Sequence, residues 1–157
     1  MKIQFKIATP ERVVYEAEID QITLPTKLGE ITILPNHIPL VSALAPGEVL
    51  IKQGKEEVPL AVSGGFVELS NNKLVILADT AERVEEIDTE RAEQARDRAR
   101  ALLNKKQTAD EVDFTALAVK IEKEMARLKV ANKYKKIKSR PQIKSLEDQI
   151  KTIEDKP

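Results

Sequence analysis

The stretch that decides the fold is GEITILPNHIPLVSALAPG, which runs from Gly29 to Gly47. Its three prolines, Pro35, Pro39 and Pro46, fix φ and remove backbone donors, so the stretch cannot form a helix. Apolar and polar residues alternate before the first proline, as in a short strand, and a strand pattern resumes after the second. We therefore expect a stiff loop that crosses between the two sheets of a small all-β unit.

Short strand patterns fill the rest of the first 87 residues. Ile3, Phe5 and Ile7 alternate with polar residues, which predicts a first strand with one buried face. Pro25 is expected to stop a strand at 19–24, and Asn71-Asn72 to form a tight turn, because Asn tolerates the left-handed region. Further strands are expected at 13–15, 49–51, 58–62, 66–69 and 74–77. Eight or more short strands predict an antiparallel β-sandwich or barrel.

The second half has the spacing of amphipathic helices. Asp88 is a good N-cap residue for a first helix. Apolar residues then recur at helical spacing at Ala92, Ala95, Ala99 and Leu102, and after a polar turn at Phe114, Leu117, Ala118, Ile121, Met125 and Leu128. Asp110 or Asp113 in the polar turn, 104–113, is expected to cap the second helix. The pattern predicts an α+β protein: a sandwich followed by an antiparallel two-helix hairpin and a short amphipathic tail.

Composition sets the domain boundaries and excludes some chemistry. Residues 1–87 carry 8 basic and 13 acidic residues, a net charge of −5, whereas residues 88–157 carry 18 and 13, a net charge of +5. All five glycines precede residue 66. We expect a sandwich over 1–87, a hairpin over 88–136 and an extension over 137–157. With no cysteine there is no thiol chemistry, and no apolar run approaches the ~20 residues of a membrane span or the core of a signal peptide.

No conventional active site is visible in the pattern. His37 is the only histidine and has neither cysteine nor a tight carboxylate cluster nearby, so we expect a loop histidine bonded to the backbone. Ser63-Gly64-Gly65 lacks the surroundings of a nucleophile elbow or a phosphate loop. Its glycines are expected to serve a bend between strands. We therefore expect neither an enzyme nor a metal site.

Three motifs point to one family. LPNHIPLVSALAPGEV at 34–49, AVSGGFVEL at 61–69 and IDTERA at 87–92 resemble the epsilon subunit of bacterial F-type ATP synthases, and the resemblance extends over residues 1–136. It implies a central-stalk subunit without an active site of its own. Its sandwich would touch the gamma subunit and the membrane rotor ring (c-ring). The ring contacts implied are Leu28, Gly29, Glu30 and Ile31, with His37 close by. The isolated chain would be a monomer, and the complex would hold it at the cytoplasmic face of a bacterial membrane.

The resemblance also implies a regulatory ATP site, although no cofactor is required. Carried over by position, its residues are Glu82, Ile87, Asp88, Arg91, Ala92, Arg98, Lys123 and Arg127. Folding of the hairpin would bring these cations together, and guanidinium groups suit phosphate oxygens. Lys123 departs from the pattern, because nucleotide-binding members have Arg there. The alternative is a solvated helix face of ion pairs.

The basic second helix has two interpretations. In the family, its cations meet acidic segments of the beta subunits when the hairpin extends, which blocks rotation in the hydrolytic direction. The corresponding residues here are Lys120, Lys123, Arg127, Lys129 and Lys133. The alternative is a β-sandwich adaptor whose basic helices bind nucleic acid or an acidic protein, although no nucleic-acid motif accompanies the basic run.

The last segment departs from the usual family pattern, which ends sooner. Its apolar residues Ile143, Leu146, Ile150 and Ile153 form a short heptad-like stripe. This stripe predicts either a third helix that packs on the hairpin or a segment that binds a partner. Its length could hinder insertion of the hairpin into the catalytic ring.

Overall fold

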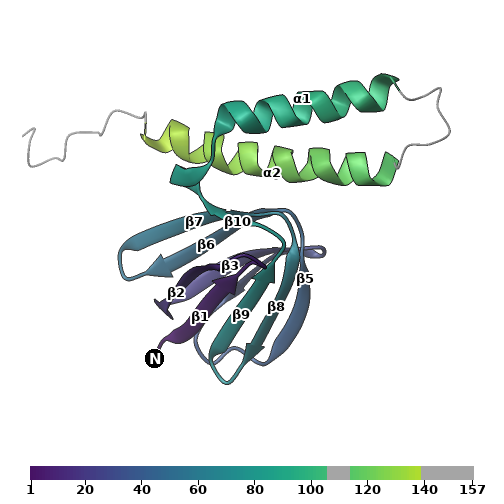
Figure 1. Cartoon of the computed structure of the whole chain (residues 1–157). Coiled ribbons are helices and arrows are strands. Elements are labelled where there is room, and N and C mark those ends of the chain that lie inside the picture. The colour runs from purple at the N-terminus through teal and green to yellow at the C-terminus, as the bar shows by residue number, and fades with distance from the viewer. Residues whose placement is uncertain (106–113, 139–157) are drawn as a thin grey trace, which may run out of the picture.

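The computed structural model describes residues 1–105 and 114–138, which form a β-sandwich with a helical hairpin docked on one end (Figure 1). Ten strands build the sandwich: β1 Ile3–Ala8, β2 Val13–Ile19, β3 Gln21–Thr26, β4 Gly29–Ile33, β5 Leu40–Leu44, β6 Gly47–Gln53, β7 Glu56–Val62, β8 Gly65–Ser70, β9 Lys73–Ala78 and β10 Ala81–Arg83. A 3-10 turn, η1 (Val84–Glu86), leads to α1 (Thr89–Lys105) and α2 (Phe114–Lys138). The predicted fold class, sandwich followed by hairpin, is confirmed.

The strands form one hydrogen-bonded sheet that folds over into two layers. The strand order is β10-β7-β6-β3-β5-β8-β9-β1-β2, with β4 added beside β3. Every pairing is antiparallel except that of β1 with β9, which is parallel. The core between the layers is aliphatic apart from Phe5, and it includes the whole predicted face of β1. The expected alternation of the first strand is therefore confirmed.

The stretch that decides the fold makes the predicted crossing. Its first part is β4, which pairs with β3, and its second part is β5, which pairs along its length with β8 in the other layer. The loop between them is fastened at the end of the sandwich that lies away from the helices. Asn36 and Asn72, both in the left-handed region, bond each other: Asn36 N donates to Asn72 Oδ1 (2.6 Å), and Asn72 Nδ2 donates to Asn36 Oδ1 (3.0 Å).

Pro25 does not stop its strand, so that prediction was wrong. β3 continues through Pro25 to Thr26 and pairs there with β4. The carbonyl of Pro25 accepts a hydrogen bond from Ala45 N, on the side of β3 away from β4. Because the N–H and C=O of one strand residue point to the same side, the N–H that proline lacks would also point away from β4. On that side β6 pairs only with residues 21–23 of β3 and β5 only with Thr26, so Pro25 lies between the two ladders.

In the hairpin, α2 lies between α1 and the sandwich (Figure 1). The α2 residues Leu128, Val130 and Ala131 are buried, as are Ala92 and Ala99 on α1. The predicted apolar stripes include residues that the packing does not bury: Leu102, Phe114 and Met125 are exposed. α2 continues two residues beyond the expected end of the hairpin. The predicted caps Asp110 and Asp113 and the rest of the tail, 139–157, lie outside the described residues.

Candidate functional site

A hollow of about 440 Å³ lies where the hairpin leaves the sandwich; we call it the hinge pocket. Its size is within the range of small-molecule sites. Its walls come from β10, η1, the first turns of α1 and the middle of α2. The lining residues are Glu82, Glu86, Asp88, Arg91, Ala92, Ala95, Lys120, Glu124 and Arg127.

Local sequence places the α1 wall of this pocket. Asp88 Oδ1 accepts a hydrogen bond from Arg91 N (3.0 Å), so Asp88 caps the helix as predicted. The cap fixes the start of the helix, and both Arg91 and Ala92 then line the pocket from its first turn. Because Ala92 is small and buried, α2 approaches closely here.

Arg127 is the centre of charge on the α2 wall. Its guanidinium group pairs with Glu82 of β10 and with Glu124 one turn earlier, at 3.2 Å. Burial alone would lower the Arg127 pKa, but the hydrogen bond and negative charge of Glu82, aided by Glu124, raise it above its usual value. The pair with Glu82 holds α2 to the sandwich edge, and any anion entering the pocket would compete with both carboxylates.

The structure brings together five of the eight residues predicted for ATP: Glu82, Asp88, Arg91, Ala92 and Arg127 line the hinge pocket. The other three lie elsewhere, and their place in the predicted set remains untested. Ile87 lines a neighbouring hollow on the α2 C-terminal side, Arg98 Nε donates to Gln94 O, and Lys123 pairs with Asp79 (3.2 Å).

Four lining residues were not predicted for the ATP site: Glu86, Ala95, Lys120 and Glu124. Helical spacing could have found three of them. Lys120 and Glu124 lie seven and three residues before Arg127 on one face of α2, and Ala95 lies one turn after Arg91. Glu86 had no such signal, because it belongs to the short η1 turn.

Ion pairs fasten α2 to the sandwich along its length. Lys123 pairs with Asp79, Arg127 with Glu82, and Lys133 with Glu48 (2.7 Å). Tyr134 also donates its hydroxyl hydrogen to Glu48. Burial, followed by the hydrogen bond to Glu48, raises the Tyr134 pKa, so the side chain stays neutral.

Three of the five cations predicted to meet the beta subunits are therefore paired with sandwich acids. Of the other two, Lys120 lines the hinge pocket, and Lys129 lines two hollows beside Pro46. Such partly exposed pairs each contribute only about 0–1 kcal/mol. The hairpin is thus attached by several weak contacts and a small apolar patch.

The predicted ring contacts lie at the two ends of β4. At one end Leu28 is fully exposed in a turn held by Thr26, whose Oγ1 donates to Gly29 O (2.6 Å) and accepts from Leu28 N (3.2 Å). Glu30 and Ile31 follow in β4. Past the other end, His37 Nδ1 bonds Ile38 O (2.8 Å), as expected for a loop histidine. The structure thus separates His37 from the Leu28 turn by the length of β4.

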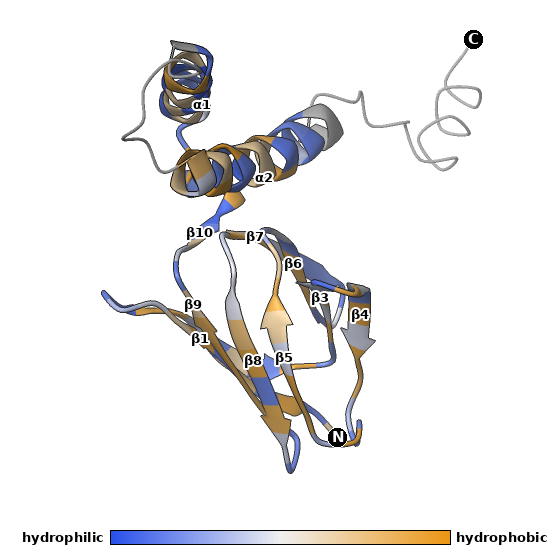
Figure 2. Cartoon of the chain, turned by 90° about the vertical axis from the view of Figure 1, so that its right-hand side faces the viewer, coloured by the Kyte–Doolittle hydropathy of each residue, from blue (hydrophilic) through white to orange (hydrophobic). Residues whose placement is uncertain are grey.

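An apolar face that was not predicted from the sequence covers the outside of β5, β8 and β9. Val41, Phe66 and Leu77 are 76%, 63% and 62% exposed. Phe66 stands directly opposite Ala43 on one side and Leu77 on the other. Figure 2 shows β5, β8 and β9 largely in orange, the colour of apolar residues, which here include residues of the core as well as those of this face. The run Leu74–Ala78, apolar at every position, could have indicated a strand with two covered faces.

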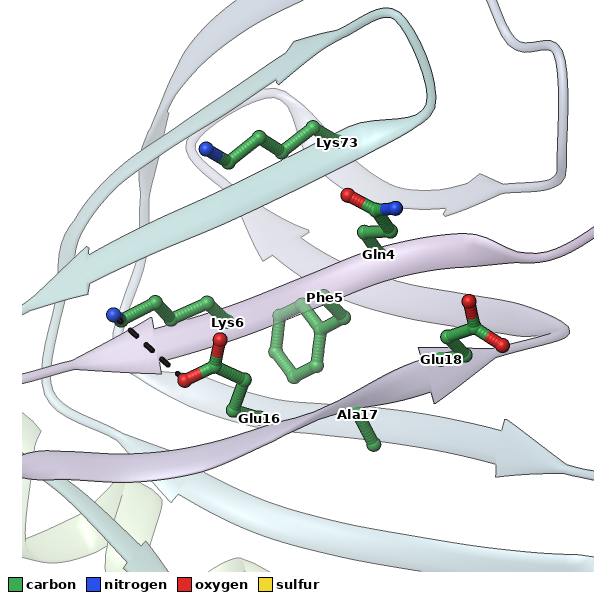
Figure 3. Close-up of a pocket in the computed structure, with 7 residues that line it drawn as sticks. All are labelled: Gln4, Phe5, Lys6, Glu16, Ala17, Glu18 and Lys73. Carbon is green, nitrogen blue, oxygen red and sulfur yellow. Dashed lines mark ion pairs between the residues drawn. The ribbon is translucent and has the colours of Figure 1, made fainter.

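A second hollow lies over β1, β2 and β9, and its lining is drawn in Figure 3. Lys6 and Glu16 pair across it (3.7 Å), with Gln4, Glu18 and Lys73 around them. This alternation of charges is typical of a solvated sheet face. Among the described residues there is no cluster of His, Cys, Asp or Glu that could hold a metal ion. Within the same part of the chain, no helix is long and apolar enough to cross a membrane.

Fold and site together define a two-part interaction protein: a β-sandwich with an exposed apolar face and a cationic helical hairpin docked on its end. Family models match the same two parts of the chain. The β-sandwich domain of the ATP synthase delta/epsilon chain matches residues 2–84, and its long α-helix domain matches residues 85–132. The chain therefore belongs to the ATP synthase delta/epsilon chain family, and the resemblance seen in the sequence is confirmed.

Individual relatives agree with the family models. The ATP synthase epsilon chain of Desulforamulus reducens is 46% identical over 80% of this chain and 93% of its own length. That of Chloroflexus aggregans is 46% identical over 86% and 96%. A chain in the Euglena gracilis mitochondrial ATP synthase structure (OSCP/F1/c-ring) superposes with a TM-score of 0.62 at 26% identity, covering 87% of this chain and 81% of that one. A chain of the Tetrahymena thermophila enzyme shares the fold, with a TM-score of 0.53.

Proposed function

We propose that this protein is a non-catalytic central-stalk subunit of a bacterial F-type ATP synthase, with a sandwich that couples gamma to the c-ring and a hairpin that restrains ATP hydrolysis. Within the assembled complex it would sit at the cytoplasmic face of the membrane. Family membership supports the stalk role, and the similar Euglena chain comes from a structure described as containing F1 and the c-ring. The observation that carries the regulatory role is the docking of the hairpin through α2, by weak ion pairs.

The two contacts of the sandwich would use different surfaces. The exposed face of Val41, Phe66 and Leu77 suits a partner that buries apolar area, and we assign it to gamma. The Leu28 turn, with its fully exposed leucine beside Glu30, and the His37 loop offer small contacts, which suit the loops of the ring. The two ends of β4 would then contact the ring at separate points.

The hairpin would regulate by exchanging partners. Lys123, Arg127 and Lys133 are paired with Asp79, Glu82 and Glu48 in the docked state, so they can reach acidic segments of beta only after these pairs break. The docked hairpin and the inhibitory contact thus exclude each other. Because each pair is weak, a modest difference in affinity would shift the population between the two states.

The test adds the whole chain, or a chain ending at residue 87, to an ATPase complex that lacks its epsilon subunit. The main hydrophobic core lies within residues 3–81, so the short form is expected to fold. We expect the whole chain to lower ATP hydrolysis, and the short form to bind the complex but inhibit at least about threefold less. Binding is checked by co-purification. Equal inhibition by both forms would remove the regulatory role from the helices.

We further propose that ATP is the regulatory ligand of the hinge pocket. Arg91, Lys120 and Arg127 bring three cations to it from both helices. The triphosphate would have to displace Glu82 or Glu124 from Arg127, so affinity is expected to be modest. ATP bound here would contact both helices and favour the docked hairpin by differential affinity. We propose no hydrolysis by the chain itself, and nucleotide turnover by the purified protein would contradict this.

Arg91 and Arg98 form a matched pair for testing the ATP site. Arg91→Ala removes a cation that lines the pocket and is expected to weaken ATP binding about tenfold or more. Arg98→Ala removes an exposed cation of the same helix that does not line it, and affinity should change less than about twofold. Isothermal titration of the isolated chain with ATP measures both. Equal losses would contradict the hinge pocket as the site, and no binding to the unaltered chain at millimolar ATP would overturn the ATP proposal.

A further inference from the structure

Beside the hairpin, where it meets the sandwich at Pro46, lies an apolar groove that neither the gamma nor the ATP proposal uses. It is a hollow of about 590 Å³ whose apolar lining is Pro46, Leu103, Ala118, Ile121, Met125 and Ala126. Met125 is 48% exposed in the wall of this groove, although its place in the apolar stripe of α2 predicts burial. Apolar hollows of this kind on a helix pair are typical docking sites for another amphipathic segment.

The chain itself carries a segment of matching chemistry. Beyond the described residues, Ile143, Leu146, Ile150 and Ile153 recur at spacings of three, four and three, which would give one apolar face. The family models end at residue 132, so this stripe is no part of the family domains. We propose that residues 143–153 bind in the groove of the same chain.

The length of the chain permits this contact. α2 ends at Lys138, and at 1.5 Å per residue Met125 lies about 20 Å back along the helix and Ile121 about 26 Å. Residues 139–142 can span ~13 Å when extended, of which about 9 Å remains along α2 once the segment is displaced sideways by a helix packing distance, and residues 143–153 add ~15 Å if helical, so the stripe reaches Met125. Pro141 disfavours continuation of α2, which suits a reversal of the chain direction at this point.

Charge also favours the intramolecular contact. The segment 142–157 has four acidic residues, Glu147, Asp148, Glu154 and Asp155, and three basic ones, Lys144, Lys151 and Lys156. The groove itself is lined by one cation, Lys129, and one carboxylate, Glu122, so charges of both signs in the segment have a partner there. A bound tail would cover the apolar lining and stabilise the hairpin in the form described above. This proposal concerns the isolated chain and does not depend on the stalk function.

Disulfide trapping can test the contact directly, because the chain has no cysteine of its own. The test variant is Met125→Cys with Ile150→Cys. The control is Glu90→Cys with Ile150→Cys: Glu90 is exposed near the start of α1, and that start packs beside residues 131–135 of α2, close to where the tail is attached. Under oxidised glutathione at micromolar protein, we expect the test pair to form the intramolecular bond at least about fivefold faster.

A second pair of variants shows whether the apolar stripe drives the contact. In the test background, Ile153→Glu should slow trapping at least about threefold, whereas Thr152→Glu adds the same charge off the stripe and should leave it unchanged. Equal trapping of the test and control pairs, or equal effects of the two glutamates, would overturn the proposal. Disulfide-linked dimers as the main product would overturn it in favour of a second copy of the chain.

Discussion

Phe66→Glu is expected to weaken binding of this protein to the gamma subunit at least about 30-fold, or ~2 kcal/mol. Phe66 lies at the centre of the exposed apolar face, opposite Ala43 and Leu77. A carboxylate there would be buried without a partner when gamma docks. The variant would also lose the apolar contacts of the phenyl group. Titration calorimetry with a gamma-containing complex gives the dissociation constant.

A matched control separates this interface effect from general surface effects. Val13→Glu makes the same kind of change at an exposed position on β2, three strands away from β8. It should change gamma binding less than about twofold. Because both side chains are at least about half exposed, neither variant should lower the melting temperature by more than a few degrees. If Phe66→Glu bound gamma normally, the assignment of this face would be wrong.

Gly65→Ala, one residue earlier on β8, is expected to destabilise the sandwich by at least about 3 kcal/mol. Gly65 has a φ of +127°, and an added Cβ would lie 2.1 Å from Leu77 O and 2.8 Å from Ala78 Cα. Both are backbone atoms of the paired strand β9, so no side-chain rotation can relieve the clash. Urea unfolding followed by circular dichroism measures the loss.

Gly54→Ala is the control for the glycine conformation alone. Gly54 also has a positive φ, +61°, but an added Cβ there would have no heavy atom within 4 Å. Only the left-handed conformation is penalised, by about 1–2 kcal/mol. Equal free energies of unfolding for the two variants would show that the close approach to β9 carries no extra cost.

Much of the fold could be predicted, because strand alternation and turn residues are local signals. The Asn71-Asn72 turn and the break between β4 and β5 follow directly from backbone preferences. Two features depend on distant partners and could not be predicted. Pro25 stays within β3 because β6 pairs only with residues 21–23 of that strand, and β1 pairs with β9 in parallel although most of the sandwich lies between them in the sequence. Neither is visible in a short window.

The candidate site was harder to predict than the fold. A helical face shows which residues align, and this placed Arg91 and Arg127 correctly near one hollow. It does not show whether a residue near that face lines the hollow or bonds elsewhere. Arg98 lies seven residues after Arg91, yet it points to Gln94 O, and Lys123 is drawn to Asp79 of the sandwich. Both outcomes depend on how α2 docks, which the sequence alone does not specify.

The reciprocal amide bonds between Asn36 and Asn72 have a mechanical consequence. They join the crossing loop to the β8–β9 turn at the end of the sandwich opposite the helices, where His37 also lies. A rotor element that yields under load stores part of each step as elastic strain and returns it late. Cross-bracing of this loop would lower its compliance, so a push received at the His37 end, the proposed ring contact, would reach the strands above with little lag.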